Sequence, residues 1–140
     1  MTEQFKHKSS VSIRFADMDS FGHVNNAIFL TYFEEARIKY FRDIVDWSYD
    51  YGKYGVILAR VEVDFIIPAV MQDEITIWTR CRRIGKKSFD LHYRMIKLKD
   101  GKEILVADCI TVMVAFDYST RESIPVPDTW REAIRKFENL

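Results

Sequence analysis

The sequence contains no long hydrophobic run, no excess of charge and no recognisable leader segment. No stretch reaches about 18 consecutive apolar residues, the length that predicts a membrane-spanning helix. The first eight residues, Met-Thr-Glu-Gln-Phe-Lys-His-Lys, have none of the apolar run that a secretory signal needs. Lys and Arg number 21 and are balanced by 21 Asp and Glu, so no net field attracts nucleic acid or an anionic membrane. We therefore expect a cytoplasmic protein that binds neither nucleic acid nor membrane.

Residues typical of metal and redox sites are few and scattered. Cys81 and Cys109 lie in apolar stretches without Cys-x-x-Cys or Cys/His spacing, which predicts buried thiols in a reducing compartment. His7, His23 and His92 form no metal-binding motif, so we predict no metal site. The sequence also lacks a Gly-x-Ser-x-Gly elbow, a P-loop and a Gly-x-Gly-x-x-Gly loop. These absences disfavour a serine hydrolase of the α/β type and the common phosphate-binding loops.

The 140 residues show no repeat and no linker, and we expect one domain over residues 1–140. A long helix is predicted from residue 26 to about residue 44, because apolar side chains recur there at helical spacing. Its apolar face comprises Phe29, Tyr32, Phe33, Ala36, Tyr40 and Ile44. The polar strip that remains is narrow, which indicates a helix packed inside the domain. A short C-terminal helix is expected after Pro127, where Trp130, Ile134 and Phe137 stand at helical spacing.

Alternation of apolar and polar residues predicts five strands. They are expected over residues 11–16, 60–65, 73–83, 88–95 and 104–116. The connectors are short, and Asp100-Gly101 is a strong hairpin signal, so neighbouring strands should be antiparallel. These elements predict an α+β fold in which a curved antiparallel sheet wraps one long helix, with a short helix at the C-terminus. Free sheet edges and an apolar outer sheet face indicate that copies of the chain associate.

The stretch from residue 14 to residue 37 carries the strongest functional signal. Asp17 and Asp19 end the first predicted strand, and Gly-His-Val-Asn-Asn at 22–26 precedes the long helix. This order places a carboxylate a few residues before the exposed amides of a helix N-terminus. A carbonyl can be polarised there while the carboxylate activates the attacking group, which is the arrangement of a hydrolase. The pattern alone leaves two interpretations of Asp19, a catalytic carboxylate or a cap of the turn before the helix.

The same stretch closely resembles the active-site segment of hotdog-fold acyl-CoA thioesterases, in the branch similar to 4-hydroxybenzoyl-CoA thioesterase. The matching residues are Asp19, Gly22, His23, Val24, Asn25, Asn26, Tyr32, Glu35, Ala36 and Arg37. The similarity continues through residues 61–65, 68–69, 73–77 and 85–89, and so covers most of the chain in the same order. The resemblance implies the hotdog fold. It also implies a homodimer in which outer strands of two protomers pair, and often a homotetramer.

The resemblance implies a catalytic role for three residues. Asp19 matches the family's nucleophile or general base, whereas Asp17 is read as a turn residue or a group behind the site. The backbone amide of Asn26 matches the family's oxyanion donor, so replacing its side chain should act only indirectly. His23 matches a histidine that contacts substrate in some branches. Its alternative role is to order the turn at Gly22 by a backbone hydrogen bond.

Five residues are implied to bind substrate. Gly22 and Val24 lie in the matching loop, and Gly22 is expected to allow a tight turn that lets substrate approach the helix start. Lys86, Lys87 and Ser88 match a basic turn that in the family contacts the phosphates of coenzyme A. The alternative for these three residues is an ordinary solvated turn.

The function implied is hydrolysis of acyl-CoA to a carboxylic acid and coenzyme A. Coenzyme A is then part of the substrate, and no cofactor is expected. Hydroxybenzoyl-specific enzymes carry an apolar residue where this chain has His23, so an aromatic acyl preference is in question. Two alternatives stay open, a thioesterase acting on acyl carrier protein and a non-catalytic acyl-CoA-binding module that kept the fold.

Overall fold

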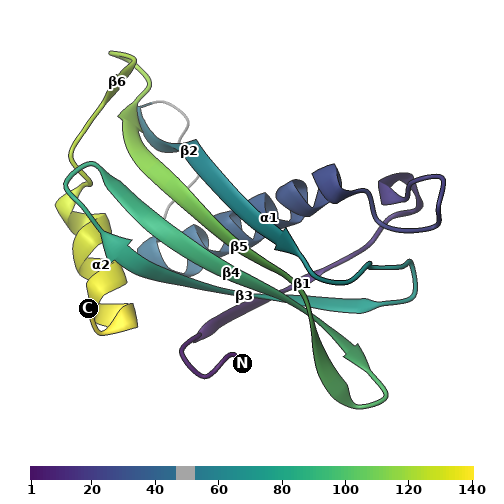
Figure 1. The fold of residues 1–140 in the computed structure, drawn as a ribbon. Coiled ribbons are helices and arrows are strands. Elements are labelled where there is room, and N and C mark those ends of the chain that lie inside the picture. The colour runs from purple at the N-terminus through teal and green to yellow at the C-terminus, as the bar shows by residue number, and fades with distance from the viewer. Residues whose placement is uncertain (47–52) are drawn as a thin grey trace.

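The computed structural model describes residues 1–46 and 53–140, which form a curved antiparallel sheet around a long helix (Figure 1). In these residues the strands are β1 (His7–Val11), β2 (Tyr54–Phe65), β3 (Glu74–Ile84), β4 (Ser88–Lys99), β5 (Lys102–Asp117) and the short β6 (Glu122–Ser123). Their order is β1-β3-β4-β5-β2, with β6 paired to β5. Helix α1 (Asn26–Tyr40) lies on the concave face, and α2 (Asp128–Glu138) packs at one end of the sheet. The predicted fold class is confirmed.

Helix α1 forms where the sequence predicts it and buries the predicted apolar face. Phe29, Tyr32, Phe33, Ala36 and Tyr40 are all at most 3% exposed. A π-helical turn (Phe41–Val45) continues the helix, so helical structure ends one residue beyond the predicted limit. No helix in the described part of the chain is long and apolar enough to cross a membrane.

The first predicted strand is wrong in its position. The sequence pattern places it at residues 11–16, but β1 ends at Val11 and Phe15–Asp17 form a 3₁₀ turn. The carboxylate of Asp17 accepts a hydrogen bond from the backbone N–H of Arg14, and the N–H of Asp17 donates to the carbonyl of Arg14. These two bonds close the turn and leave Phe15 86% exposed, so alternation of residue types misled the prediction here.

The other four strands are found, with longer bounds in most cases. β2 begins at Tyr54 rather than at residue 60, because it pairs with β5 along its whole length. The β4–β5 hairpin turns at Asp100 and Gly101, whose φ angles of 53° and 74° are the left-handed values that an Asp-Gly turn requires. The β3–β4 connection at residues 85–87 is also a short turn.

Strand β2 forms one edge of the sheet and has a strand neighbour on one side only within the described residues. Leu58, Val61 and Phe65 pair with buried residues of β5 and therefore face the concave side. They are nevertheless 46%, 36% and 45% exposed. An edge strand with an apolar inner face is typical of a surface that another chain covers.

Candidate active site

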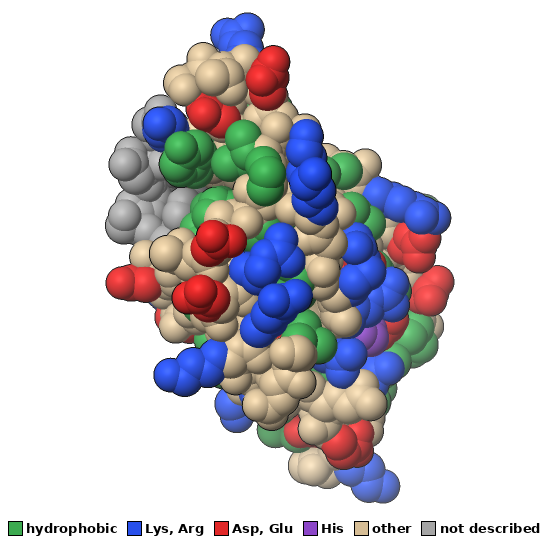
Figure 2. Space-filling model, turned by 90° about the vertical axis from the view of Figure 1, so that its left-hand side faces the viewer, with side chains coloured by type: hydrophobic (Ala, Val, Ile, Leu, Met, Phe, Trp, Pro, Cys, Tyr) green, Lys and Arg blue, Asp and Glu red, His purple; other side chains and the backbone are tan. Residues whose placement is uncertain are grey.

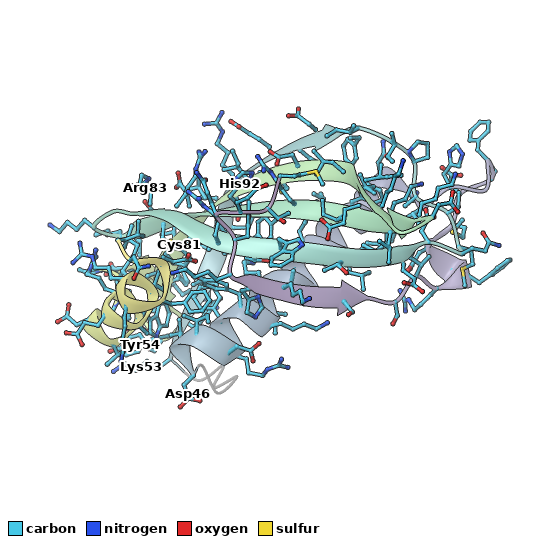
Figure 3. All side chains as sticks on the ribbon, turned by 90° about the horizontal axis from the view of Figure 1, so that it is seen from below. Asp46, Lys53, Tyr54, Cys81, Arg83 and His92 are labelled. Atoms are coloured by element: carbon cyan, nitrogen blue, oxygen red, sulfur yellow. The ribbon has the colours of Figure 1, made fainter. Side chains whose placement is uncertain are left out.

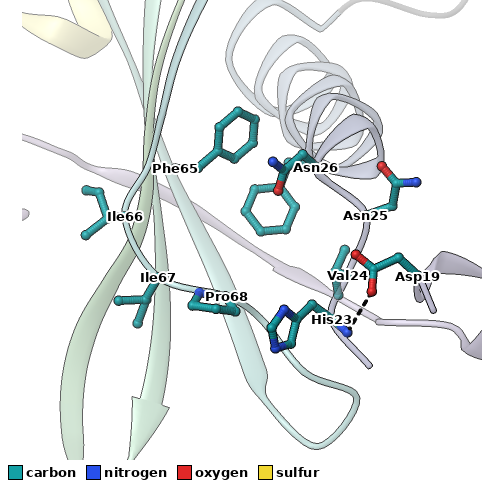
Figure 4. Close-up of a pocket in the computed structure, with 10 residues that line it drawn as sticks. Asp19, His23, Val24, Asn25, Asn26, Phe65, Ile66, Ile67 and Pro68 are labelled. Carbon is teal, nitrogen blue, oxygen red and sulfur yellow. Dashed lines mark hydrogen bonds between the residues drawn. The ribbon is translucent and has the colours of Figure 1, made fainter. Parts of the chain in front are cut away.

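A cavity of about 410 Å³ lies where α1 begins, between the loop before the helix and the end of β2 (Figure 4). Two groups of residues line it. From the loop and helix come Asp19, His23, Val24, Asn25, Asn26 and Phe29, and from the end of β2 and beyond come Phe65, Ile66, Ile67 and Pro68. The sequence places the first group in one motif. The second group is brought there only by folding, because β2 runs alongside α1 and ends beside the first turn of the helix.

The first turn of α1 borders this cavity, and its first amide, that of Asn26, has no hydrogen-bond acceptor among the described residues. Asn25 is the N-cap, as expected, and its side-chain oxygen accepts from the N–H of Ala27 at 2.9 Å. Asn26 is the first helical residue, so its amide has no intrahelical acceptor and lies at the positive end of the helix dipole. Its side chain is exposed and lines the cavity. An oxygen that gains negative charge is stabilised by such a donor.

Asp19 is half-buried at the edge of the same cavity. Its Oδ1 accepts from the backbone N–H groups of Phe21 and His23, at 2.9 and 3.2 Å. Within residues 1–46 and 53–140 no hydrogen bond reaches its Oδ2. The side chain therefore orders the loop through one oxygen and leaves the other without a hydrogen bond from the described residues, so the cap and the catalytic interpretation are compatible.

The loop between Asp19 and the helix is a tight turn. The N–H of Gly22 donates to the carbonyl of Asp19 at 3.2 Å, and the N–H of Asp19 donates to the carbonyl of His23 at 2.7 Å. Gly22 has φ of +81°, whereas a Cβ built there would meet no atom within 4 Å. The glycine is thus needed for the backbone conformation, and it does not line the cavity. The predicted turn is confirmed, and a role of Gly22 in substrate binding stays a prediction.

His23 and Val24 both line the cavity but differ in burial. The His23 ring is exposed, and the backbone of this residue, rather than its ring, makes the bonds with Asp19. Val24 is 2% exposed and its N–H donates to the carbonyl of Ala69 at 2.8 Å. That bond attaches the loop to the segment that follows β2. The His23 ring is consequently available to a ligand, while Val24 forms part of the wall.

Asp17 is behind the cavity and not in it. Its side chain is 1% exposed, and its Oδ2 accepts from the hydroxyl of Tyr32 at 2.5 Å. Burial alone would raise the pKa of the Asp17 carboxyl, but the hydrogen bonds from Tyr32 and from Arg14 outweigh burial and lower it. The sequence indicated a turn role for Asp17, which is confirmed. It could not reveal the bond to Tyr32, because that partner is fifteen residues away on α1.

The lowered pKa of Asp17 predicts a stability difference that depends on pH. Above the ordinary carboxyl pKa of 3.8 its stabilising contribution is fully present, and it is lost as pH falls through the lower pKa of the folded state. We expect Asp17→Asn to lower the free energy of unfolding by about 1–3 kcal/mol at pH 7. The gap between variant and wild type should shrink below about pH 4. Urea denaturation of both proteins at pH 7, 4 and 3 measures it, and an unchanged gap contradicts the assignment.

Within a single protomer, the residues that line this cavity do not include Lys86, Lys87 or Ser88. Lys86 and Lys87 lie in the β3–β4 turn, and Ser88 begins β4. The turn packs against the segment before α2 through a bond from the N–H of Val126 to the carbonyl of Lys86. The turn lies at the end of the sheet where β2 starts, with β5 between them, since the carbonyl of Lys87 accepts from the N–H of Ala115 and Ala115 pairs with Val56. Figure 2 looks onto the end of the molecule that carries α2 and shows Lys and Arg side chains gathered there. The basic turn and the Asp19 loop thus occupy opposite ends of the sheet.

The two cysteines are unsuited to nucleophilic chemistry. Burial raises the pKa of the Cys81 thiol to about 12 and that of the Cys109 thiol to about 12. Cys81 lies on β3 next to α2 (Figure 3), and its backbone N–H donates to the side chain of Glu138. Both are free thiols, as expected. No group of three or more His, Cys, Asp or Glu side chains in the described residues is placed to hold a metal ion.

Comparison with known proteins gives a consistent family assignment. Residues 13–134 match the model of the thioesterase-like superfamily. A thioesterase from Thermus thermophilus, solved in complex with coenzyme A and Zn, is 34% identical, with 99% of this chain and 98% of that chain covered and a TM-score of 0.82. The long-chain acyl-CoA thioesterase FadM of Escherichia coli is 24% identical over 93% of this chain and 98% of its own length. A Pseudomonas aeruginosa protein shares the fold, with 22% identity, 96% and 92% of the two chains covered and a TM-score of 0.85.

Proposed function

The chain belongs to the thioesterase-like superfamily and is a thioester hydrolase, and we propose that it hydrolyses acyl-CoA to a carboxylic acid and coenzyme A. The observation that carries the proposal is that Asp19 and Asn26, the first residue of α1, line one cavity. The Thermus relative bound to coenzyme A and the name of FadM support an acyl-CoA as substrate. Thiol release from a panel of acyl-CoAs differing in chain length tests it, and no release from any of them contradicts it.

In the proposed mechanism the thioester carbonyl oxygen accepts a hydrogen bond from the amide of Asn26. Asp19 takes the proton of a water molecule whose oxygen attacks the carbonyl carbon, or its carboxylate attacks directly and gives a mixed anhydride. The resulting oxyanion is stabilised by the helix N-terminus. The C–S bond then breaks, and coenzyme A leaves as a thiolate that takes up a proton. On the anhydride route a water molecule then hydrolyses the anhydride, which releases the carboxylic acid and restores the Asp19 carboxylate. Phe29 and Phe65 give the cavity an apolar wall for the acyl group.

We further propose that the complete site requires a homodimer joined along β2, with a homotetramer as the higher assembly. A two-fold pairing of β2 with its copy is antiparallel, so Tyr54 of one protomer lies near Phe65 of its partner. The Lys86–Lys87 turn stands at the Tyr54 end, and the Asp19 cavity at the Phe65 end. The pairing therefore brings the basic turn of one protomer towards the cavity of the other. The ammonium groups can there contact the phosphates of coenzyme A.

This arrangement predicts complementation between two inactive variants. Asp19→Asn and the double variant Lys86→Glu/Lys87→Glu should each retain about one hundredth of wild-type kcat/KM or less, by loss of the carboxylate and by repulsion of phosphate. A mixed dimer has one site with both defects and one with none. The mixed dimer, selected from the co-expressed chains, should thus have about one half of wild-type activity.

The measurement is kcat/KM of co-expressed chains purified through two different tags. Each variant expressed alone with both tags is the control for residual activity. If the mixed dimer is no more active than the average of the two parents, each site lies within one chain and the shared site is wrong. Sedimentation of all three preparations establishes that the variants still form dimers.

A further inference from the structure

The carboxylate of Asp17 is buried two residues before Asp19, yet it does not line the cavity. We infer that Asp17 and Tyr32 are positioning residues, which hold Asp19 and the first amide of α1 in one fixed arrangement. The inference rests on the proposed function, because it assigns these two residues to the geometry of the proposed site. A buried carboxylate with a short bond to a buried tyrosine is a rigid link between two elements.

One side of this link is helix α1. Tyr32 is 3% exposed and lies nearly two turns into the helix, and its hydroxyl donates to Oδ2 of Asp17 at 2.5 Å. Burial and the neighbouring carboxylate raise the pKa of the Tyr32 hydroxyl, so it remains a donor at every physiological pH. The link is therefore not broken by ordinary pH changes.

The other side of the link is the 3₁₀ turn that precedes the Asp19 loop. The backbone N–H of Arg14 donates to Oδ2 of Asp17 at 3.0 Å, and the Arg14 guanidinium donates to Oδ1 at 3.0 Å. The Arg14 side chain is 71% exposed, so its ion pair contributes little. The bonds to the Arg14 backbone and to the Tyr32 hydroxyl are the ones that fix the carboxylate.

The backbone of Asp17 connects this link to both reacting groups. Its carbonyl accepts from the N–H of Asn25 at 2.9 Å, one residue before the proposed oxyanion donor. Next to this bond, Met18 and Val24 form an isolated antiparallel β-bridge, which closes the base of the loop that carries Asp19. A shift of Asp17 must consequently move Asp19, two residues along the chain, and the amide of Asn26. A misplacement of about 1 Å at such groups lowers a rate by about 100-fold.

Tyr32→Phe tests the inference, with Tyr40→Phe as the matched control. Tyr40 is also buried on α1 and donates to a carboxylate, Glu138, at 2.7 Å, but it lies at the far end of the helix. We expect Tyr32→Phe to lower kcat about tenfold or more with less than a threefold change in KM. Tyr40→Phe should keep kcat within about twofold of wild type. It should lower the midpoint of thermal unfolding by about as much as Tyr32→Phe does. Asp17→Asn, if it folds, should lower kcat further than Tyr32→Phe.

A second measurement does not depend on turnover. Hydrogen–deuterium exchange of residues 19–25 reports the amides of Asp19, Gly22, His23 and Asn25, which all bond within the loop or to Asp17. These amides should exchange about tenfold faster in Tyr32→Phe and at the wild-type rate in Tyr40→Phe.

The outcomes separate this inference from the proposed function. If the wild type hydrolyses acyl-CoA but Tyr32→Phe and Tyr40→Phe have the same kcat, Tyr32 and Asp17 serve stability alone and the inference is overturned. If the wild type hydrolyses no acyl-CoA, the proposed function fails and exchange decides: faster exchange in Tyr32→Phe alone supports positioning, and equal exchange in the two variants refutes it.

Discussion

Asp19→Asn is expected to lower kcat by about 10³-fold, with little change in KM or in the midpoint of thermal unfolding. Asparagine keeps an oxygen where Oδ1 of Asp19 accepts from the amides of Phe21 and His23, so the loop should retain its shape. The amide can neither take a proton from water nor attack the thioester. Loss of turnover without loss of fold is therefore the signature of a catalytic carboxylate. Steady-state thiol release on the best acyl-CoA gives kcat and KM.

Asp117→Asn is the matched control for this variant. Oδ1 of Asp117 accepts from the N–H of Ser119, two residues on, as Oδ1 of Asp19 accepts from Phe21. It orders a turn at the end of β5 and does not line the cavity of its own protomer. We expect Asp117→Asn to keep kcat within about twofold of wild type. Near-wild-type turnover in Asp19→Asn would show that Asp19 only caps its turn.

Asn26→Pro is expected to lower kcat by about 10²–10³-fold, which corresponds to about 2.7–4 kcal/mol of lost transition-state stabilisation. Proline removes the backbone N–H that no ordinary side-chain replacement can remove. It is well tolerated at the first position of a helix, where that N–H has no intrahelical acceptor. The preceding residue, Asn25, has φ of −60° and ψ of 133°, the extended conformation that proline imposes on its predecessor. The helix should therefore form as before.

Asn26→Ala is the control, because it deletes the side chain and keeps the amide. We expect its kcat to stay within about threefold of wild type, and circular dichroism of both variants to match the wild type. A wild-type kcat in the proline variant would contradict the oxyanion assignment. Equal losses in the two variants would instead assign the effect to the Asn26 side chain.

Local patterns predicted most of the fold because its elements follow local rules. The spacing of Phe29, Tyr32, Phe33 and Ala36 predicted α1, and Asp100-Gly101 predicted the β4–β5 turn through its left-handed backbone. The strand predicted at residues 11–16 was misplaced, because a side chain there competes with strand pairing for a backbone hydrogen bond. Asp17 bonds the backbone of Arg14 and closes a turn, and residue alternation carries no information about such a bond.

The sequence by itself determined the loop that carries Asp19, the cap at Asn25 and the helix that follows, because these depend on neighbours within a few residues. Only the tertiary structure decided that Phe65 to Pro68 complete the cavity and that Tyr32 holds Asp17. It also placed the Lys86–Lys87 turn far from Asp19 in one protomer, although the family resemblance implies that both contact the same substrate. The physical reason is that packing and strand register set distances between residues far apart in the chain, and no local pattern records those distances.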